Sequence, residues 1–373
     1  MGVALLSAIF LITAHPYTYD QAIHGGYADI IDYIAVANVS DIGGLYDFSL
    51  NHAFHRIERW PVHYLMGYLS RVANIDVWMM ERTAVVFGML VGALLIANLK
   101  SFSVWKKIVF HALFIFSPYA FRQYYSAPGM LSDCYFYVAV LGVAVGMWNR
   151  QYALLTFALV ISCFMRQTSI LLLPMILIYG YVFKIKRSDI VVATGIGLLA
   201  FLSMKYLNSI VFNMGANTSY VFTHTLGLFY WLFSAPNAIE FLDFIGRYVL
   251  MILSLSPLIF LIPIVGKRNL VFIAFFFMMH IQPLLGGPEI TGNNIDRLSI
   301  YGLPFLGLLL ADGVEDSNLS LIFILLLFIE SLLPNFSILY GIPYGRYLYL
   351  ISVIVIFIVS IIIRKKYSSG THS

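Results

Sequence analysis

Long apolar stretches separated by short polar segments dominate the pattern of this chain. Runs such as Leu270–Leu285 and Tyr347–Ile363 approach or reach the roughly 17–25 apolar residues that a helix needs to cross about 30 Å of hydrocarbon. These runs are continuous rather than alternating, which favours helices that satisfy their own backbone groups in lipid. The pattern therefore predicts an all-α fold, a polytopic transmembrane helical bundle.

The apolar runs predict about 12 spans, in a range of roughly 10 to 13. We expect them to form a single membrane domain over residues 1–373, because the sequence shows no strong internal repeat and no separate soluble domain. The expected spans are Gly2–Ala14, Val77–Leu99, Val104–Ala120, Cys134–Met147, Tyr152–Met165, Ile170–Phe183, Ile190–Phe212, Phe244–Val265, Leu270–Leu285, Leu298–Leu310, Leu319–Leu333 and Tyr347–Ile363.

Composition supports the same class of protein. Hydrophobic residues make up 61% of the chain and charged residues 11%, whereas a soluble domain carries roughly 25% charged residues. A soluble fold could not bury so much apolar surface. Cys134 and Cys163 both lie in apolar stretches, which indicates buried packing rather than a disulfide framework.

Basic residues predict the orientation of the bundle. Counting spans from a cytoplasmic N-terminus places five basic clusters on the cytoplasmic side, as the positive-inside rule requires. Both termini are then cytoplasmic, and the segment Val3–Ala14, which lacks a basic region before it, becomes a short first span rather than a signal peptide. The clusters are Lys100/Lys106/Lys107, Arg150, Lys184/Lys186/Arg187, Lys267/Arg268 and Arg364/Lys365/Lys366.

The opposite side receives most of the histidines and acidic residues. A long first external loop, residues 15–76, contains two stretches with helical spacing of apolar positions, Ile30–Val39 and Trp60–Val72. We expect these stretches to be interfacial helices lying on the membrane. A second external amphipathic segment, residues 213–243, contains a similar stretch at Tyr220–Phe233.

Acidic residues are concentrated in the first loop. On a helix, Asp29, Asp32 and Tyr33 share one face, and Asp20 precedes them. A carboxylate here could accept a proton from a hydroxyl group, or hold a divalent cation, although the sequence does not require a metal. A solvated loop whose acids face water explains the composition equally well.

Basic residues of the same loop form a second candidate site. His55, Arg56 and Arg59 fall at helical spacing with His52, and the planar guanidinium group suits phosphate oxygens. A juxtamembrane cluster that touches lipid headgroups or pairs with Glu58 is an equal alternative. No spacing typical of a zinc site is present.

Further ionisable residues stand at the expected outer ends of spans. Asp133, Arg166 and Arg297 occupy such positions, where a charge is energetically costly and is a functional candidate by default. Snorkelling to the interface is the alternative explanation. Glu81 and Arg82 are better explained as partners of neighbouring helices.

Two histidines lie within apolar runs, at His111 and His280. We expect these to be hydrogen-bonded core residues rather than ligands.

Taken in order, these elements resemble the GT-C superfamily of integral membrane glycosyltransferases. That family carries an acidic motif directly after the first span, and the stretch Asp29–Ala37 is similar to it, with Ile30 where a glutamate is usual. The stretches His55–Ser70, Ser126–Asp133, Met165–Pro174 and Asn293–Gly313 resemble later segments of the family.

The resemblance implies an enzyme of the bacterial inner membrane with an extracytoplasmic active site. It would transfer a sugar from a polyprenyl-phosphate-linked donor to a glycan, lipid or protein, with membrane lipids but no nucleic acid as partners. Asp29, or Asp32 or Asp20 in another register, would be the general base. The candidates for substrate binding would be Tyr33, His55, Arg56, Arg59, Asp133, Arg166 and Arg297.

Two other functions stay open. An O-antigen-type polymerase or ligase would share the membrane setting and the lipid-linked substrate, but would depend on external Arg and His residues. A lipid or solute transporter would use the intramembrane charges as a path, and more often shows broken spans in two matching halves.

Overall fold

The protein is all-helical wherever its structure is described, with no strand in that part of the chain. The computed structural model describes residues 2–24, 29–45, 58–117, 120–212, 227–234, 237–255, 267–291 and 300–313, together with residues 354, 355, 358 and 362. The chain divides into two compact units. Unit 1 comprises residues 1–8, 101–120 and 218–373, and unit 2 comprises residues 9–100 and 121–217.

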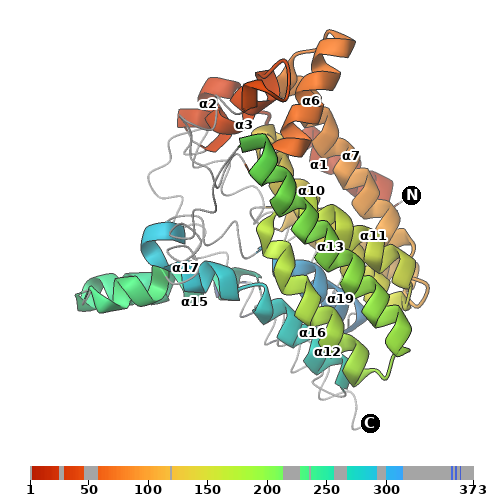
Figure 1. Ribbon diagram of the computed structural model, residues 1–373. Helices are drawn as coiled ribbons and strands as arrows, with labels where there is room; N and C mark the ends of the chain where they lie inside the picture. The colour runs from red at the N-terminus through yellow and green to blue at the C-terminus, as the bar shows by residue number, and fades with distance from the viewer. Residues whose placement is uncertain are drawn as a thin grey trace. The chain divides into compact units, whose positions relative to one another are not determined.

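Unit 2 contains most of the residues that the sequence singles out. After the end of α1 (Gly2–Thr13), which the two units share, its helices follow the order of the chain (Figure 1). They are α2 (Tyr19–His24), α3 (Asp29–Asn38), α6 (Trp60–Ala73), α7 (Val77–Ala97), α9 (Phe121–Ser126), η1 (Pro128–Met130), α10 (Leu131–Asn149), α11 (Tyr152–Met165), η2 (Gln167–Leu171), α12 (Leu172–Val182) and α13 (Arg187–Phe212).

Three segments are long and apolar enough to cross a membrane among the described residues. They are Val77–Ala97, Pro128–Asn149 and Arg187–Phe212, and each overlaps an expected span. Gly2–Thr13, Tyr152–Met165, Gln167–Val182 and Ile300–Asp312 are apolar but shorter. The fold class is thus a helical protein with three candidate membrane-spanning helices, and the larger count of spans stays a prediction.

The burial of these helices distinguishes the centre of unit 2 from its outside. In the most apolar window of each segment, the share of buried residues is 94% for Pro128–Asn149, 39% for Val77–Ala97 and 22% for Arg187–Phe212. Glycines bring α11 close to α10, because a Cβ on Gly146 would lie 2.9 Å from the backbone nitrogen of Leu155. A helix that is apolar on all sides is buried, and α10 follows this rule.

The two predicted interfacial stretches form a pair of packed helices, α3 and α6. Figure 1 shows them with α2 at one end of α7. Pro61 opens α6, where its missing N–H costs nothing, and Asn74 ends it in the left-handed conformation with a φ of 52°. A Cβ on Gly67 would lie 1.7 Å from the carbonyl oxygen of Ala37, so α6 and α3 touch backbone to backbone.

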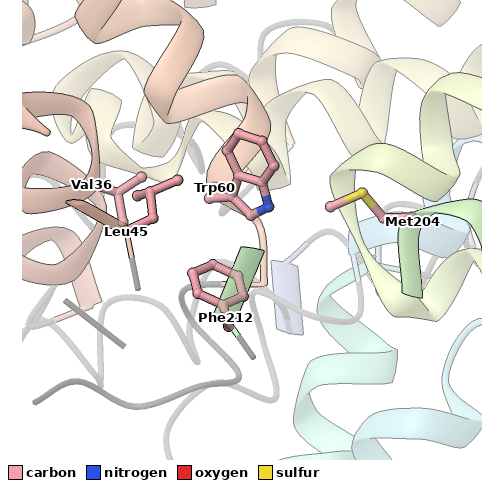
Figure 2. Packing of buried hydrophobic residues seen from close by; sticks show 5 residues of the cluster. All are labelled: Val36, Leu45, Trp60, Met204 and Phe212. Carbon is pink, nitrogen blue, oxygen red and sulfur yellow. The ribbon is translucent and has the colours of Figure 1, made fainter. Parts of the chain in front are cut away.

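A hydrophobic cluster links this helix pair to α13. Figure 2 shows Trp60 between Val36 and Leu45 on one side and Met204 on the other, with Phe212 nearby. All five side chains are buried. The start of α6 is therefore fixed against the end of α13, which brings the residues beside Trp60 close to that helix.

Two arginines of unit 2 donate hydrogen bonds to backbone carbonyl oxygens, including those of the segment around the end of α1. Arg82 donates to the carbonyl oxygens of Tyr17 at 2.8 Å and of Tyr125 at 3.2 Å. Arg122 donates to the carbonyl oxygen of Thr13 at 2.7 Å. Burial lowers the pKa of Arg122 to about 10, so this guanidinium is charged at neutral pH. The expectation that Arg82 pairs with neighbouring elements is confirmed.

Unit 1 contains α8 (Val104–Phe116), α15 (Ala238–Leu255), α16 (Lys267–Met278), α17 (Ile281–Thr291), η5 (Ile300–Gly302) and α19 (Leu303–Gly313). Residues 227–233 are also helical, while residues 213–226 lie outside the described part of the second external segment. The expected span at 270–285 is interrupted, because α16 ends at Met278 and α17 begins only at Ile281.

The isolated histidines and the cysteines behave as expected of core residues. His111 Nε2 lies 3.0 Å from Ser7 Oγ, and His280 Nδ1 lies 2.7 Å from the carbonyl oxygen of Phe276. Cys134 and Cys163 are buried free thiols. Both thiols lie in unit 2, so their reactivity reports on the unfolding of that unit.

The contact between α6 and α3 predicts that Gly67→Ala will be strongly destabilising. The added methyl group collides with backbone rather than with a flexible side chain, so the helices must separate, at a cost of about 1–3 kcal/mol or more. Purified protein is heated in detergent with a dye that fluoresces on reaction with thiols, which detects exposure of Cys134 and Cys163.

Gly195→Ala is the matched control, because no atom beyond the adjoining residues and backbone of its own helix lies within 4 Å of a Cβ at that glycine. It should leave the unfolding temperature unchanged or raise it, since Ala favours helix over Gly. Equal unfolding temperatures for Gly67→Ala and the wild type would contradict the packing of α3 on α6.

Candidate functional site

A buried polar network lies in unit 2, beginning with α3 and the residues just before α6. Arg59 Nη1 donates to Tyr33 Oη at 2.7 Å. The same nitrogen lies 3.4 Å from Asp133 Oδ1 in the first turn of α10. Tyr33 is 1% exposed, Arg59 8% and Asp133 0%, so these polar groups meet away from bulk solvent.

Arg166 approaches the same carboxylate from another element. It ends α11 in an extended conformation with φ −153° and ψ 147°, and η2 begins at the next residue. This break places the guanidinium at a helix end, where Nη1 forms an ion pair with Asp133 Oδ1. One carboxylate therefore serves two arginines, Arg59 and Arg166.

A second carboxylate, that of Glu58, connects several elements in a similar way. Its Oε2 accepts from Lys205 Nζ at 2.7 Å and also from the side-chain amide of Gln167. Glu58 is 6% exposed, while the side chain of Lys205 is 41% exposed. These contacts thus tie the turn before α6 to η2 and to α13.

His63 supports the network through Tyr33. Its Nδ1 lies 2.8 Å from Glu81 Oε1, and both side chains are fully buried. Its ring stacks on the Tyr33 ring with a centroid distance of 4.6 Å and an angle of 3°. Glu81 is thus a partner of a neighbouring helix, as expected, and the stack holds the Tyr33 hydroxyl that faces Arg59.

Glu58, Arg59, Arg166, Gln167 and Lys205 border a small open pocket in unit 2. Its polar wall carries three cationic groups and one carboxylate, together with two amides. Its apolar wall comes from α11 and α13 and includes a thiol and two thioethers. The lining residues are Glu58, Arg59, Cys163, Met165, Arg166, Gln167, Phe201, Met204, Lys205 and Asn208.

The charges of this pocket favour an anion. Arg59, Arg166 and Lys205 are opposed by Glu58 in the lining itself and by Asp133 behind the two arginines. The balance of these five groups is one positive charge. Burial strengthens electrostatic interactions because water screens them less. Guanidinium groups present paired N–H donors that match phosphate oxygens.

The acidic candidates lie on the helices beside this network. Asp32 is buried, Asp29 is partly exposed and Asp20 is exposed. Burial, together with the charges of Asp20 and Asp32, raises the pKa of the Tyr19 hydroxyl. The acids of α2 and α3 are therefore close enough to act on one group, and α3 also supplies Tyr33 to the arginine.

Three predicted binding residues, His55, Arg56 and Arg297, lie outside the described residues. The structure brings four others, Tyr33, Arg59, Asp133 and Arg166, into one network. Within the described ranges, no three His, Cys, Asp or Glu side chains are grouped as metal ligands.

Comparison of this chain with protein-family models, with curated proteins and with solved structures finds no match.

Lys205 and Gln167 are not among the candidates predicted from the sequence, and Glu58 was expected only as a possible partner of the neighbouring arginines. A signal for Lys205 was present, since it is a lone lysine within the apolar run Ile190–Phe212, and an ionisable residue in such a run is a functional candidate. Nothing in the local sequence indicated a role for Gln167, because its hydrogen-bond partner, Glu58, is 109 positions away.

The shared carboxylate predicts that Asp133→Asn will lower the stability of unit 2. Removing one partner from a buried ion pair leaves charge without compensation, which costs about 3–5 kcal/mol. Thiol exposure on heating measures the effect, as for Gly67. Asp41→Asn removes an exposed carboxylate and keeps the oxygen that accepts from Gly44 N at 3.0 Å, so it should change little. Equal stability of the two variants would contradict the proposed role of Asp133.

Proposed function

We propose that this protein is an integral membrane glycosyltransferase. It moves a sugar from a polyprenyl-phosphate-linked donor to an extracytoplasmic glycan, lipid or protein acceptor. The observation that carries the proposal is the pocket lined by Arg59, Arg166 and Lys205 in a unit built from apolar helices. A lipid-linked phosphate needs this combination of cationic groups and surrounding apolar helices. The resemblance to the GT-C superfamily supplies the class of donor.

The reaction needs stabilisation of a leaving phosphate. The acceptor hydroxyl oxygen attacks the anomeric carbon, the bond from that carbon to the phosphate oxygen breaks, and the hydroxyl proton passes to a carboxylate. Negative charge grows on the departing phosphate, and preorganised donors directed at such charge are usually the largest contribution to catalysis. Arg59 and Arg166 supply these donors, and Asp133 keeps both in place.

The general base comes from the acids of α2 and α3. Asp29 is the first candidate from the motif, with Asp32 and Asp20 as alternatives. Tyr33 joins α3 to Arg59 through a 2.7 Å hydrogen bond, which supports a common site for base and phosphate. Asp32 is adjacent to Tyr33 and is buried, which favours it over the exposed Asp20.

The proposed topology completes the hypothesis. About 12 spans place both termini in the cytoplasm and the first loop outside, in a bacterial inner membrane. The pocket residues from the first loop and from the junction after α11 then lie at the extracytoplasmic side, where the lipid-linked donor presents its headgroup. A divalent cation is compatible with the acids but is not required.

An O-antigen-type polymerase or ligase is the second candidate, favoured by the central place of Arg59 and Arg166 in the network. A transporter is the candidate from a different class, since Lys205 and Glu58 lie among apolar helices. Transfer assays separate the three, because a transporter forms no covalent product and a polymerase or ligase tolerates loss of the acids.

Replacing the true base should lower transfer by about 10²–10⁴-fold. Asp29→Asn, Asp32→Asn and Asp20→Asn are purified, reconstituted in liposomes and assayed with a panel of radiolabelled lipid-linked sugars. Asp41→Asn is the control for an exposed aspartate. If all three variants transfer sugar like the wild type, the proposed base is wrong and the polymerase or ligase gains support.

Arg166→Lys should lower kcat by about 10²–10³-fold, because it keeps the charge but loses the paired donors that stabilise the leaving phosphate. The same liposome assay provides kcat and KM. Arg150→Lys is the matched control, since this arginine is exposed at the end of α10. Unchanged kinetics for Arg166→Lys would remove Arg166 from the phosphate site.

A further inference from the structure

One oxygen of Glu58 holds two groups of the pocket wall. Oε2 accepts from Lys205 Nζ at 2.7 Å and from the amide of Gln167. Both donors belong to the pocket lining. The carboxylate is nearly buried, whereas Lys205 is 41% exposed. The fixed member of this ion pair is therefore Glu58, and the movable member is the long lysine side chain.

The position of Lys205 explains why it needs a counter-ion. It lies within α13, a candidate membrane span in whose most apolar window only 22% of the residues are buried inside the protein. A charge among apolar helices is costly unless it is paired. Glu58 supplies the negative charge in the empty pocket.

The carboxylate of Glu58 also repels an anionic ligand. A phosphate that enters the pocket meets Arg59 and Arg166, whose charges are already shared with Asp133. It also meets the negative charge of Glu58. A phosphate oxygen can take the place of the carboxylate on Lys205, because both are acceptors for the same ammonium group.

We propose that Glu58 is a displaceable counter-ion, which neutralises Lys205 in the empty pocket and yields it to the phosphate of a bound lipid. Glu58 keeps its hydrogen bond from Gln167 during the exchange, while the Lys205 side chain turns to the ligand. This inference rests on the proposed function for the anionic lipid headgroup, and it adds Lys205 to the groups that bind the phosphate.

The exchange has a consequence for turnover. Binding that must first separate Lys205 from Glu58 is weaker than binding to an unpaired lysine, because the ligand gains one ion pair as the protein loses another. The released lipid phosphate leaves more easily for the same reason. Glu58 thus lowers the affinity of the pocket for the phosphate and makes release of the lipid phosphate easier.

A binding experiment on the full chain in neutral detergent tests the proposal. The probe is farnesyl phosphate, a short prenyl monophosphate, and farnesol measures any contribution of the apolar tail. Calorimetry gives Kd for the wild type, Glu58→Gln, Lys205→Met and the double variant. Exposed residues provide the controls Glu240→Gln and Lys186→Met, which should bind like the wild type.

We expect Glu58→Gln to lower Kd for farnesyl phosphate about tenfold, and Lys205→Met to raise it about tenfold. In the Lys205→Met background, Glu58→Gln should lower Kd by less than it does in the wild type, because only the direct repulsion between Glu58 and the phosphate is removed and no Lys205–Glu58 ion pair has to be broken. Unchanged or weaker binding by Glu58→Gln would show that the pair only stabilises the fold, and would overturn the proposal.

If Glu58→Gln does not fold, Glu58→Asp is the second variant. Its shorter side chain moves the carboxylate away from Lys205, so it should also lower Kd, and a rise in Kd would overturn the proposal.

The outcomes separate this inference from the proposed function. Transfer of sugar by the wild type, without coupling between Glu58 and Lys205, would refute the counter-ion alone. Coupling in the binding assay, without transfer from any lipid-linked sugar, would refute the glycosyltransferase and leave the counter-ion in place. A wild-type protein that does not bind farnesyl phosphate would refute both.

Discussion

The carboxylate of Asp133 is the constraint on which the buried polar network of unit 2 depends. It is fully buried, in the first turn of α10, and it forms ion pairs with guanidinium groups from two other elements. A buried charge without compensation would cost several kcal/mol. The turn before α6 and the break after α11 must therefore both come to the start of α10, and this convergence creates the pocket.

Packing of apolar helices makes that convergence possible. Gly146 lets α11 approach α10, and Gly67 lets α6 lie against the backbone of α3. Trp60 then fixes the start of α6 against α13 through the hydrophobic cluster and a 3.1 Å hydrogen bond to Asn208. Because Glu58 and Arg59 directly precede this tryptophan, they are carried to the pocket by its packing.

The arrangement separates two electrostatic tasks. Asp133 holds Arg59 and Arg166 rigidly in a buried site, where donors need no rearrangement to stabilise a developing charge. Glu58 holds the more exposed Lys205, whose flexible stem can move. Under the proposed function, a fixed pair of arginines beside a movable lysine would suit a ligand that must bind, react at its phosphate and leave.

The sequence by itself determined the helical class and three long apolar helices, and it predicted helices at two stretches of the first loop and a set of charged candidate residues. These follow from local properties: the length of apolar runs, helical spacing, and the cost of a charge such as Asp133 or Arg166 near lipid. Only the tertiary structure decided which charges meet. Glu58 and Lys205 are 147 positions apart, and no local pattern relates them. Their pairing results from the packing of Trp60 on α13, which depends on side-chain shape across distant segments rather than on the order of residues within either one.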